Sequence, residues 1–339
     1  MKTLTYQTRL ALDDLAEIDE PVPQPGPREV LVRVRAVSLN YRDLAIARAE
    51  YGSFPVPLVP ASDATGEVVA VGPGTERFAV GDRVCLAYVP DWIDGPANAQ
   101  TSARRLGGPS PGVLTEYVCA AEDAVVRAPS TLSFEEASTL PIAGVSAWQA
   151  VITEGRVHPG SVVGVTGTGG ASLFVVQIAR MAGARVILVG RDPAKLARAG
   201  ELGAITVDST RDPAWERRVL ELTGGAGVDL FVDMIGGEGL GRSIAATRFG
   251  GAVSLFGFVA GTRPTLDLVA TIRRSVTLRA TSGGSRASFE ALVRAIDANG
   301  IRPPIDRVFP FGLDGVRRAF THLAEGRPFG KVVVSMDAA

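Results

Sequence analysis

Cysteine and histidine are scarce in this sequence of 339 residues. Its two cysteines, Cys85 and Cys119, lack the close spacing of metal-binding pairs, so the sequence predicts neither a cysteine zinc site nor a disulfide framework. We interpret them as unpaired thiols, and the sequence leaves open a single bridge between them. The two histidines are His158, in a turn before Pro-Gly, and His322, in a predicted late helix, and we assign neither a catalytic role.

Net charge and long apolar runs are also absent. The 35 basic and 36 acidic residues give a formal net charge of −1, which excludes a general electrostatic attraction to nucleic acid or to a membrane surface. No apolar run approaches the roughly 18 residues of a membrane span, and no basic-apolar segment at the N-terminus resembles a secretory signal. We therefore expect a cytoplasmic protein that acts on a small molecule. The length and composition suit a globular chain with two domains.

Glycine, by contrast, is concentrated in a turn near the middle of the chain. The surrounding pattern is apolar run, turn, amphipathic stretch and second apolar run, at residues 162–165, 167–172, 173–182 and 186–189. This pattern of apolar residues predicts a strand-helix-strand unit. The turn has the sequence GTGGAS, which departs from the G-x-G-x-x-G pattern because Ser172 replaces the third glycine.

Two glycines of this turn have specific roles in a dinucleotide site. Gly167 permits the tight turn, Gly169 lets the backbone approach a pyrophosphate, and the N-terminus of the following helix faces the phosphates. The sequence therefore predicts a dinucleotide-binding unit. A tight turn that binds nothing is the alternative.

The end of the second strand indicates which dinucleotide binds. An NAD site carries an acidic residue there to bind the ribose hydroxyls, but this strand ends Gly190-Arg191. A guanidinium at this place would not repel a 2′-phosphate and has the geometry to bind one. Asp192 and Pro193 are better explained as the N-cap and first residue of the next helix, in which Lys195 is a second candidate phosphate ligand. We favour NADP(H), with NAD(H) left open.

The N-terminal third has the pattern of β structure. Strands are predicted at 29–38, 66–71, 80–87, 113–119 and 124–128, with turns between them. About six strands without intervening helices suggest a small barrel. Residues 90–112, rich in Pro, Gly, Ala and Ser, are predicted to form a long surface loop.

From Ser133 onward the period becomes helical. A capping box at 133–136 begins a helix that ends near Pro141, and a second helix is predicted at 144–154. Further strands are predicted at 228–234, 252–258 and 275–280, and six parallel strands is the natural count for a complete dinucleotide fold. The last part has a helix, a strand, a helix and a strand, at 289–299, 305–311, 313–325 and 331–335. We expect this tail to complete the barrel, so that the barrel domain spans 1–128 and 283–339 and the nucleotide domain spans 129–282.

Five motifs along the chain carry a family resemblance. They are AVSLNYRD at 36–43, GEVVAVG at 66–72, VGDRV at 80–84, LPIAG at 140–144 and GTGG at 167–170. Together they resemble the medium-chain dehydrogenase/reductase superfamily, which includes zinc alcohol dehydrogenases and zinc-free quinone and enoyl reductases. The resemblance covers essentially the whole chain. It implies an α/β fold with a GroES-like β-barrel catalytic domain and a doubly wound, parallel-sheet Rossmann domain.

The sequence departs from the zinc members of this family at the positions of the metal ligands. Where the resemblance places zinc ligands, the chain has Asn40, Ser62 and Ile142. Zinc requires thiolate, imidazole or carboxylate ligands in a tetrahedral arrangement, which these residues do not supply. The structural zinc lobe of the family would fall in residues 90–112, which contain no cysteine. We therefore predict that the protein binds no zinc.

The zinc-free reductases imply hydrogen-bond donors instead of a metal. By resemblance, the Asn40 amide holds the substrate carbonyl or the nicotinamide ribose, and Tyr51 donates a proton to the α-carbon. Tyr41 is a reserve acid, while Asp43 and Asp63 orient the site or form ion pairs. The plainer alternatives are that Asn40 only ends a strand and that the Tyr51 ring only covers a cleft.

The resemblance also implies contacts to the cofactor. It places Ser146 behind the nicotinamide, backbone groups at 256–259 near the nicotinamide amide, and Lys331 near the phosphates. The plainer roles are a helix hydroxyl bonded to its own backbone, core aromatics and a strand-edge lysine. The predicted cofactor residues are Ser146, Thr166, Gly167, Thr168, Gly169, Gly170, Ala171, Ser172, Gly190, Arg191, Lys195, Ile235, Gly257, Phe258, Val259 and Lys331.

A reductase without a metal needs an activated substrate. Hydride added to the β-carbon of an enone or a quinone leaves charge on an enolate oxygen, which ordinary donors stabilise, whereas an isolated carbonyl gives an alkoxide without a partner. The sequence therefore predicts an NADPH-dependent, zinc-independent reductase of a quinone or an α,β-unsaturated carbonyl compound. The alternatives are a zinc-free alcohol dehydrogenase or carbonyl reductase and an NADPH-binding protein without turnover. We also expect a homodimer, because the strand predicted at 275–280 leaves an unpaired edge.

Overall fold

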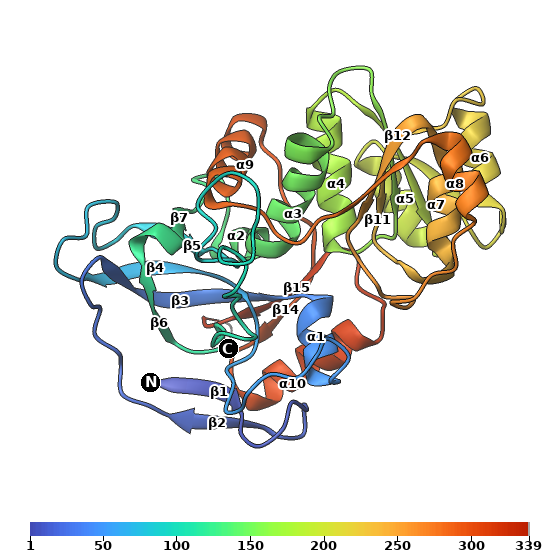
Figure 1. The fold of residues 1–339 in the computed structure, drawn as a ribbon. Coiled ribbons are helices and arrows are strands. Elements are labelled where there is room, and N and C mark those ends of the chain that lie inside the picture. Colours follow the sequence, from blue (N-terminus) through green and yellow to red (C-terminus); the bar gives the residue numbers. More distant parts are fainter. Residues whose placement is uncertain (338–339) are drawn as a thin grey trace. The chain divides into compact units, whose positions relative to one another are not determined.

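The computed structural model describes residues 1–337 and divides the chain into two compact units (Figure 1). The first unit is formed by Met1–Val145 together with the segment that begins at Gly283, and the second unit is Ser146–Ser282. Both ends of the chain therefore belong to the first unit. Within residues 1–337, no helix is both long enough and apolar enough to cross a membrane.

The first unit is built on a seven-stranded sheet and a separate two-stranded sheet. The seven strands follow the order β14-β15-β3-β4-β5-β7, with β6 paired to β3. Their hydrophobic side chains and those of the β1-β2 pair form one buried core. The strands are β1 (Lys2–Tyr6), β2 (Leu15–Asp19), β3 (Glu29–Leu39), β4 (Asp63–Val71), β5 (Arg83–Leu86), β6 (Tyr117–Ala121), β7 (Val125–Arg127), β14 (Ile305–Pro310) and β15 (Lys331–Ser335).

Strand β3 organises this sheet because it is long enough to have three partners. Its first half pairs with β6 and its second half pairs with β15, while β4 runs along it antiparallel. The last residue of β3, Leu39, lies opposite Val332, and Ser38 lies opposite Asp63. The end of β3 therefore meets the beginnings of both β4 and β15, which is the geometry on which the site below depends.

Four α-helices accompany the sheet: α1 (Tyr41–Ala47), α2 (Phe134–Ser138), α9 (Arg286–Asn299) and α10 (Leu313–Ala324). The Ser133 side chain accepts from Glu136 N and caps α2, as the capping box predicts. Helix α2 packs on β3 and β4, and Thr65 Oγ1 donates to Phe134 O at 2.6 Å. For this reason the structure places residues 129–145 in the first unit, and the expected boundary at 128/129 is corrected to 145/146.

The second unit contains a six-stranded parallel sheet with the order β10-β9-β8-β11-β12-β13. The strands run outward from β8 in one direction and from β11 in the other, so the order reverses between these two strands. Ligands of open α/β sheets bind at such a reversal, beyond the carboxyl ends of the strands. The strands are β8 (Val162–Thr166), β9 (Arg185–Gly190), β10 (Ile205–Asp208), β11 (Val228–Asp233), β12 (Thr247–Leu255) and β13 (Thr277–Ala280).

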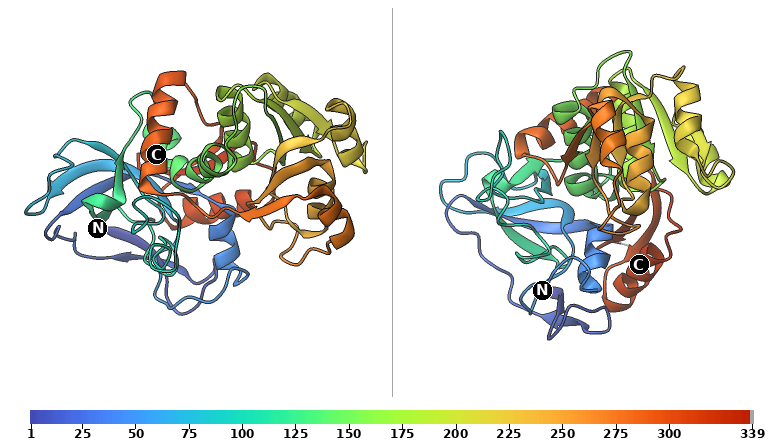
Figure 2. Two further views of the ribbon diagram at one scale, coloured as in Figure 1. Left: turned by 45° about the horizontal axis from the view of Figure 1, so that its top comes forward. Right: turned by 45° about the vertical axis from the view of Figure 1, so that its right-hand side comes forward.

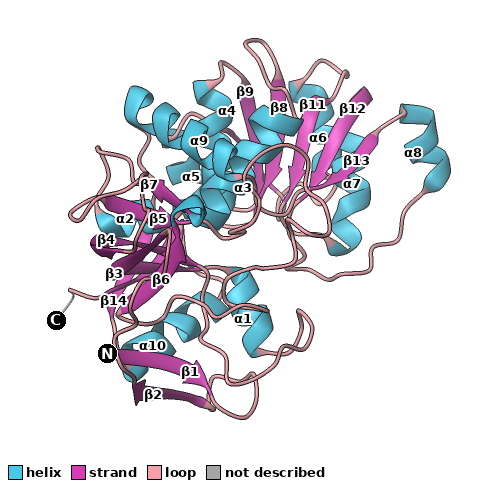
Figure 3. Ribbon diagram, turned by 60° about the vertical axis from the view of Figure 1, so that its left-hand side comes forward, coloured by secondary structure: helices cyan, strands magenta, loops and turns pink. Residues whose placement is uncertain are grey.

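Helices alternate with these strands, as Figures 2 and 3 show. They are α3 (Val145–Trp148), α4 (Gly170–Met181), α5 (Pro193–Glu201), α6 (Trp215–Leu222), α7 (Leu240–Ala246) and α8 (Leu268–Arg274). Helices α6 and α7 pack on each other. Right-handed crossovers on the two sides of the reversal put α4 and α5 on one face of the sheet and α6 and α7 on the other. The predicted doubly wound fold of this domain is confirmed.

Several predicted element boundaries are wrong. Strand β5 does not extend back to residue 80, because Gly81 has φ +94° and Asp82 closes a turn by accepting from Ala79 N. The strand expected at 113–119 is β6 at 117–121, since the N–H of Val113 donates to Pro60 O and Ala61 O outside the ladder. Strand β12 stops at Leu255 instead of reaching 258, and the helix expected at 144–154 is α-helical for one turn and then π-helical.

Candidate active site

The glycine turn has the backbone geometry that the sequence predicts. Gly167 has φ +84°, a conformation that favours glycine, and its N–H donates to Val189 O at 2.8 Å. Gly169 is the exposed N-cap of α4, and a Cβ added there would meet no atom within 4 Å. Open space in front of a helix N-terminus suits a pyrophosphate. Thr168, Gly170 and Ala171 complete this turn.

Two hydroxyls of the predicted cofactor set are used within the chain. Thr166 Oγ1 accepts from Met234 N at 3.0 Å, and Ser172 Oγ donates to Thr166 O at 2.8 Å. Both side chains are buried. The Ser172 side chain therefore joins the helix to the end of β8, and this explains why the third glycine of the pattern is dispensable here.

The loops after β11 and β12 lie at the same carboxyl edge of the sheet. Asp233, which is buried, accepts from Ile235 N at 2.9 Å and from Gly236 N at 2.7 Å. Ala260 N donates to Ile235 O, which links this loop to the one that contains Gly257, Phe258 and Val259. A Cβ on Gly257 would lie 2.0 Å from Met234 O, so the close approach of the two loops requires glycine. Val259 is 55% exposed.

The end of β9 presents its basic residue to solvent. Gly190 O accepts from Ser209 N and Ser209 Oγ, and Arg191 is exposed. Asp192 Oδ1 accepts from Ala194 N and Lys195 N, which confirms Asp192 as the N-cap of α5. Ser146, by contrast, is 1% exposed in α3.

In the first unit, Asn40 lies between a buried cation and a buried anion. Lys331 Nζ donates to Asn40 Oδ1 at 2.6 Å and to Leu39 O at 2.9 Å, and Asn40 Nδ2 donates to Asp63 Oδ2 at 2.9 Å. Lys331 is 4% exposed and Asp63 is fully buried, whereas Asn40 is half-buried. In this arrangement the ammonium group of Lys331 binds the side chain of Asn40 and the backbone of Leu39, and its expected place near the phosphates stays a prediction.

Burial shifts the pKa of both charged partners of Asn40 toward the neutral form. It raises the pKa of Asp63 to about 7, against the opposing effect of the Lys331 ammonium. It lowers the pKa of Lys331, against the opposing effect of Asp63. The Nζ and Oδ2 atoms are 4.0 Å apart, so the amide of Asn40 bridges a loose ion pair.

A second buried pair, Arg42 and Asp43, lies beside the first. Asp43 Oδ2 accepts from Asn40 N at 2.8 Å, and burial raises its pKa while Arg42 opposes the shift. Arg42 Nη1 donates to Ser62 Oγ at 2.9 Å and to Leu106 O at 3.1 Å, and Nη2 donates to Gly108 O. The sequence analysis missed Arg42, although it stands inside the AVSLNYRD motif. Its guanidinium fastens part of the 90–112 loop to the end of β3.

The two predicted tyrosines lie in this unit in different surroundings. The Tyr51 ring centroid is 5.3 Å from the guanidinium carbon of Arg42, and that of Tyr88 is 5.2 Å from it. The half-buried ring of Tyr41 packs instead against the barrel core. Tyr51 therefore shares the neighbourhood of Arg42, while Tyr41 begins α1 as a core residue.

The chemistry of this cluster does not suit a zinc ion. Among residues 1–337 there is no group of three or more His, Cys, Asp or Glu side chains placed to hold a metal. The two carboxylates, Asp43 and Asp63, are matched by the two cations, Arg42 and Lys331, that share their site. A dication here would face these two cations and would find only two carboxylates as ligands, fewer than the three or four protein ligands of a zinc site.

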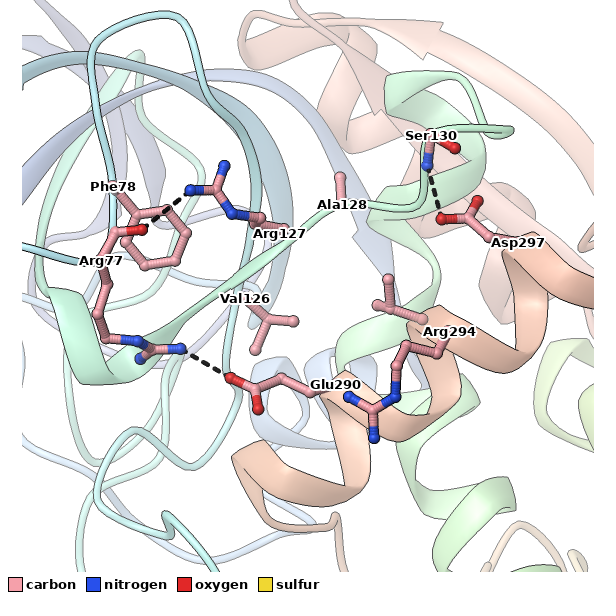
Figure 4. A pocket seen from close by; sticks show the side chains of 10 residues that line it. Arg77, Phe78, Val126, Arg127, Ala128, Ser130, Glu290, Arg294 and Asp297 are labelled. Atoms are coloured by element: carbon pink, nitrogen blue, oxygen red, sulfur yellow. Dashed lines mark hydrogen bonds and ion pairs between the residues drawn. The ribbon is translucent and has the colours of Figure 1, made fainter.

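A second group of charged side chains, separate from the cluster around Asn40, lines a groove elsewhere in the first unit (Figure 4). Arg77 Nη2 donates to Glu290 Oε1 at 2.7 Å, and Asp297 accepts from Ser130 N at 3.2 Å. Arg127 pairs with Asp82 at 2.6 Å. We interpret the groove as the place where Glu290 and Asp297 of α9 bind the segments around Arg77 and Ser130.

Comparisons with known proteins agree with this architecture. A model of the alcohol dehydrogenase GroES-like domain matches residues 26–130, and a model described as zinc-binding dehydrogenase matches residues 170–298. The chain is 37% identical over 337 residues to a zinc-type alcohol dehydrogenase-like protein of Schizosaccharomyces pombe, with 96% of each chain covered. The chain belongs to the medium-chain dehydrogenase/reductase superfamily. It is therefore an oxidoreductase of a family that binds NAD(P).

Other members of the superfamily resemble the chain over nearly its full length. A quinone oxidoreductase of Pseudomonas aeruginosa is 30% identical over 325 residues, with 92% of each chain covered. The crystal structure of a putative alcohol dehydrogenase from Sinorhizobium meliloti 1021 superposes with a TM-score of 0.92 and 40% identity, and the match covers 99% of this chain and 98% of the other. These similarities confirm the superfamily and the fold that the motifs predict.

Proposed function

We propose that this member of the superfamily is an NADPH-dependent, zinc-independent reductase of a quinone or an α,β-unsaturated carbonyl compound. The observation that carries the proposal is the charge-balanced cluster around Asn40, which stands where the resemblance places zinc ligands. An amide held between Lys331 and Asp63 is a hydrogen-bond donor site and not a Lewis acid. The name of the Pseudomonas aeruginosa relative, a quinone oxidoreductase, supports the same substrate class.

In the proposed reaction each residue has a separate role. The turn at Gly167 and Gly169 holds the pyrophosphate, and the bound cofactor supplies the hydride. Asn40 Nδ2 donates to the substrate oxygen as negative charge develops there, after hydride reaches the β-carbon. Tyr51, or a water in its place, then gives the proton that the α-carbon requires. The product is the saturated ketone or, from a quinone, the hydroquinone.

The exposed guanidinium of Arg191 supports NADPH as the cofactor. It follows β9 directly, and the nearest carboxylate in sequence, Asp192, is occupied as a helix cap. Charge-assisted binding of a 2′-phosphate by a planar fork is favourable, whereas NADH offers no such group. Arg191→Ser should therefore weaken NADPH binding and leave NADH binding nearly unchanged.

The second candidate function is a zinc-free alcohol dehydrogenase or carbonyl reductase. The alcohol dehydrogenase activity, but not the absence of zinc, is favoured by the names of the Schizosaccharomyces pombe relative, a zinc-type alcohol dehydrogenase-like protein, and of the Sinorhizobium meliloti structure. In that reaction the hydride goes to the carbonyl carbon, and Asn40 and Tyr51 would have to stabilise and protonate an alkoxide. The two functions therefore differ in the carbon atom that receives the hydride.

An isotope experiment separates the two functions. The chelator-treated protein is given an enone with NADPH that carries deuterium in the transferred position, and the product is analysed by NMR. We expect deuterium at the β-carbon of a saturated ketone. Deuterium at the carbonyl carbon of an allylic alcohol would establish the carbonyl reductase instead.

We further propose that the protein is a homodimer formed through the edge of the parallel sheet. Strand β13 ends that sheet and all four of its residues are exposed. The neighbouring helix α8 buries no residue, and Leu268, Val269 and Ile272 are each at least 60% exposed. An open strand edge beside exposed apolar side chains is suited to pairing with a second copy.

A further inference from the structure

The pairing of three strands sets the surroundings of Asn40. Asn40 follows the last residue of β3, Asp63 begins β4 and Lys331 begins β15. Because β4 and β15 both run antiparallel to β3, their first residues lie beside its end. A lysine and an aspartate that are 291 and 23 residues away in sequence from Asn40 are thereby brought to opposite ends of one amide.

When Lys331 is protonated and Asp63 is ionised, these neighbours leave the Asn40 amide only one orientation. A protonated lysine donates but cannot accept, so it requires the amide oxygen, and an ionised carboxylate only accepts, so it requires the amide nitrogen. Rotating the amide by half a turn would place N–H against the ammonium and C=O against the carboxylate. The second Nδ2 hydrogen remains for another acceptor, and Asn40 is half-buried while both partners are buried.

From this geometry we propose that Lys331 and Asp63 are positioning residues that orient and polarise the Asn40 amide toward the substrate oxygen. The inference rests on the proposed function of Asn40. The Lys331 ammonium at the amide oxygen draws electron density away from the nitrogen, which makes its N–H groups stronger donors, while the Asp63 carboxylate accepts one N–H and so fixes the direction of the other. Lys331 thus gives a neutral side chain part of the electrostatic effect that a metal supplies in other enzymes.

A purely structural role explains this arrangement less well. Burying a lysine and an aspartate is costly, and the two charged atoms are 4.0 Å apart with an amide between them. Apolar side chains at such places are often as stabilising as a buried ion pair or more so. The charges are therefore better explained by what they do to Asn40 than by the stability of the sheet.

A double-mutant cycle tests the inference on the rate. Asn40→Ala should lower kcat about 100-fold, as the loss of one oxyanion donor does. Lys331→Gln, which keeps a neutral donor, should lower kcat about 10-fold and leave the dissociation constant of NADPH within about twofold. In the Asn40→Ala background, Lys331→Gln should have no further effect on kcat. Independent effects that multiply would overturn the inference.

Matched variants control for loss of charge alone. Lys2→Gln and Asp314→Asn change exposed residues of the same types and should leave kcat unchanged. If Lys331→Gln does not fold, the double variant Lys331→Met with Asp63→Asn removes one positive and one negative charge and leaves the net charge of the cluster unchanged. That double variant should also lower kcat about 10-fold, and unchanged kcat would contradict the inference.

A measurement without turnover tests the orientation of the amide. The sequence contains three asparagines, Asn40, Asn98 and Asn299, so labelling with 15N-asparagine gives three side-chain amide groups. We expect the two Asn40 protons to have well-separated shifts that converge in Lys331→Gln and in Asp63→Asn, which adds a fourth amide signal, while Asn98 and Asn299 do not change. Asn40 signals that are the same in all variants would overturn the inference.

The outcomes also distinguish the inference from the proposed function. If the protein does not reduce conjugated acceptors, the proposed function fails, and the NMR result still decides whether Lys331 and Asp63 orient Asn40. If Asn40→Ala retains the wild-type kcat with a conjugated acceptor, the amide does not act on the substrate, so the inference fails while the proposed reaction stands. If Asn40→Ala is impaired and the effects of the Lys331 variant multiply with it, the inference alone fails.

Discussion

At the scale of single residues, the site depends on contacts that cross the sequence. Asn40 and Tyr51 were predictable because a short motif contains or precedes them, and the structure places both near Arg42 or its neighbour Asp43. The role of Lys331 was not predictable, because it requires knowing that β15 pairs with the end of β3. A lone lysine before a Val-Val-Val run carries no sign of this partner.

The raised pKa of Asp63 predicts a pH dependence of stability. The pKa of the Asp63 carboxyl is about 7 in the folded chain and 3.8 ordinarily, so the folded chain binds the carboxyl proton more tightly than the unfolded chain does. The stabilisation that results is complete below about pH 4 and is lost as the pH rises through about 7. The free energy of unfolding of the wild type should therefore fall relative to that of Asp63→Asn over this range. Denaturant titrations of both proteins at several pH values measure it.

Three other titratable groups face Asp63 and are the same in both proteins. Lys331 opposes the shift of Asp63, Asp43 reinforces it, and Cys85 is a buried thiol whose pKa burial raises. Asp63 also raises the pKa of Lys331 and of Cys85, so the comparison between wild type and variant measures the Asp63 proton together with its effect on these two groups. A difference in stability that does not change with pH would contradict a raised pKa at Asp63.

At the scale of elements, the parallel sheet was predicted well and the edges of the molecule poorly. The apolar runs of β8, β9 and β11 are buried on both faces, so their sequences identify them. The short strands β1, β2 and β10 have no such run and were missed. Helix α1 was missed because its seven residues follow β3 with only Asn40 between them.

The open space at the N-terminus of α4 predicts the effect of a side chain at Gly169. Gly169 has φ −78° and no atom lies within 4 Å of an added Cβ, so Gly169→Val should fold normally. The valine methyl groups would occupy the place of the pyrophosphate, and NADPH binding should weaken at least about 100-fold. Fluorescence titration with NADPH measures the affinity, and thermal unfolding checks the fold.

A matched change at Ser172 provides the control for this element. Ser172→Gly restores the third glycine but removes the hydrogen bond to Thr166 O, so it should cost about 1 kcal/mol of stability and leave NADPH affinity nearly unchanged. Equal affinities for Gly169→Val and Ser172→Gly would contradict the assignment of the phosphate site.

At the scale of the whole molecule, the exposed edge of the parallel sheet predicts a dimer. Sedimentation should give about twice the 35.4 kDa mass of one chain. Ile272→Glu, at a side chain that is 72% exposed, should yield a monomer, because it puts a charge into the apolar surface that the second copy would cover. Val80→Glu, at a comparably exposed position in the other unit, should remain a dimer. A wild-type protein that sediments as a monomer would contradict the proposal.

The central claim is that this chain reduces conjugated carbonyl compounds without a metal. Its most direct test is the rate of NADPH oxidation by protein treated with a chelator and verified to be metal-free, with an α,β-unsaturated ketone or a quinone compared with a saturated aldehyde. We predict turnover of the conjugated acceptors alone, at a rate that added zinc does not change. Turnover of the aldehyde, or activity that the chelator abolishes and zinc restores, would contradict the account.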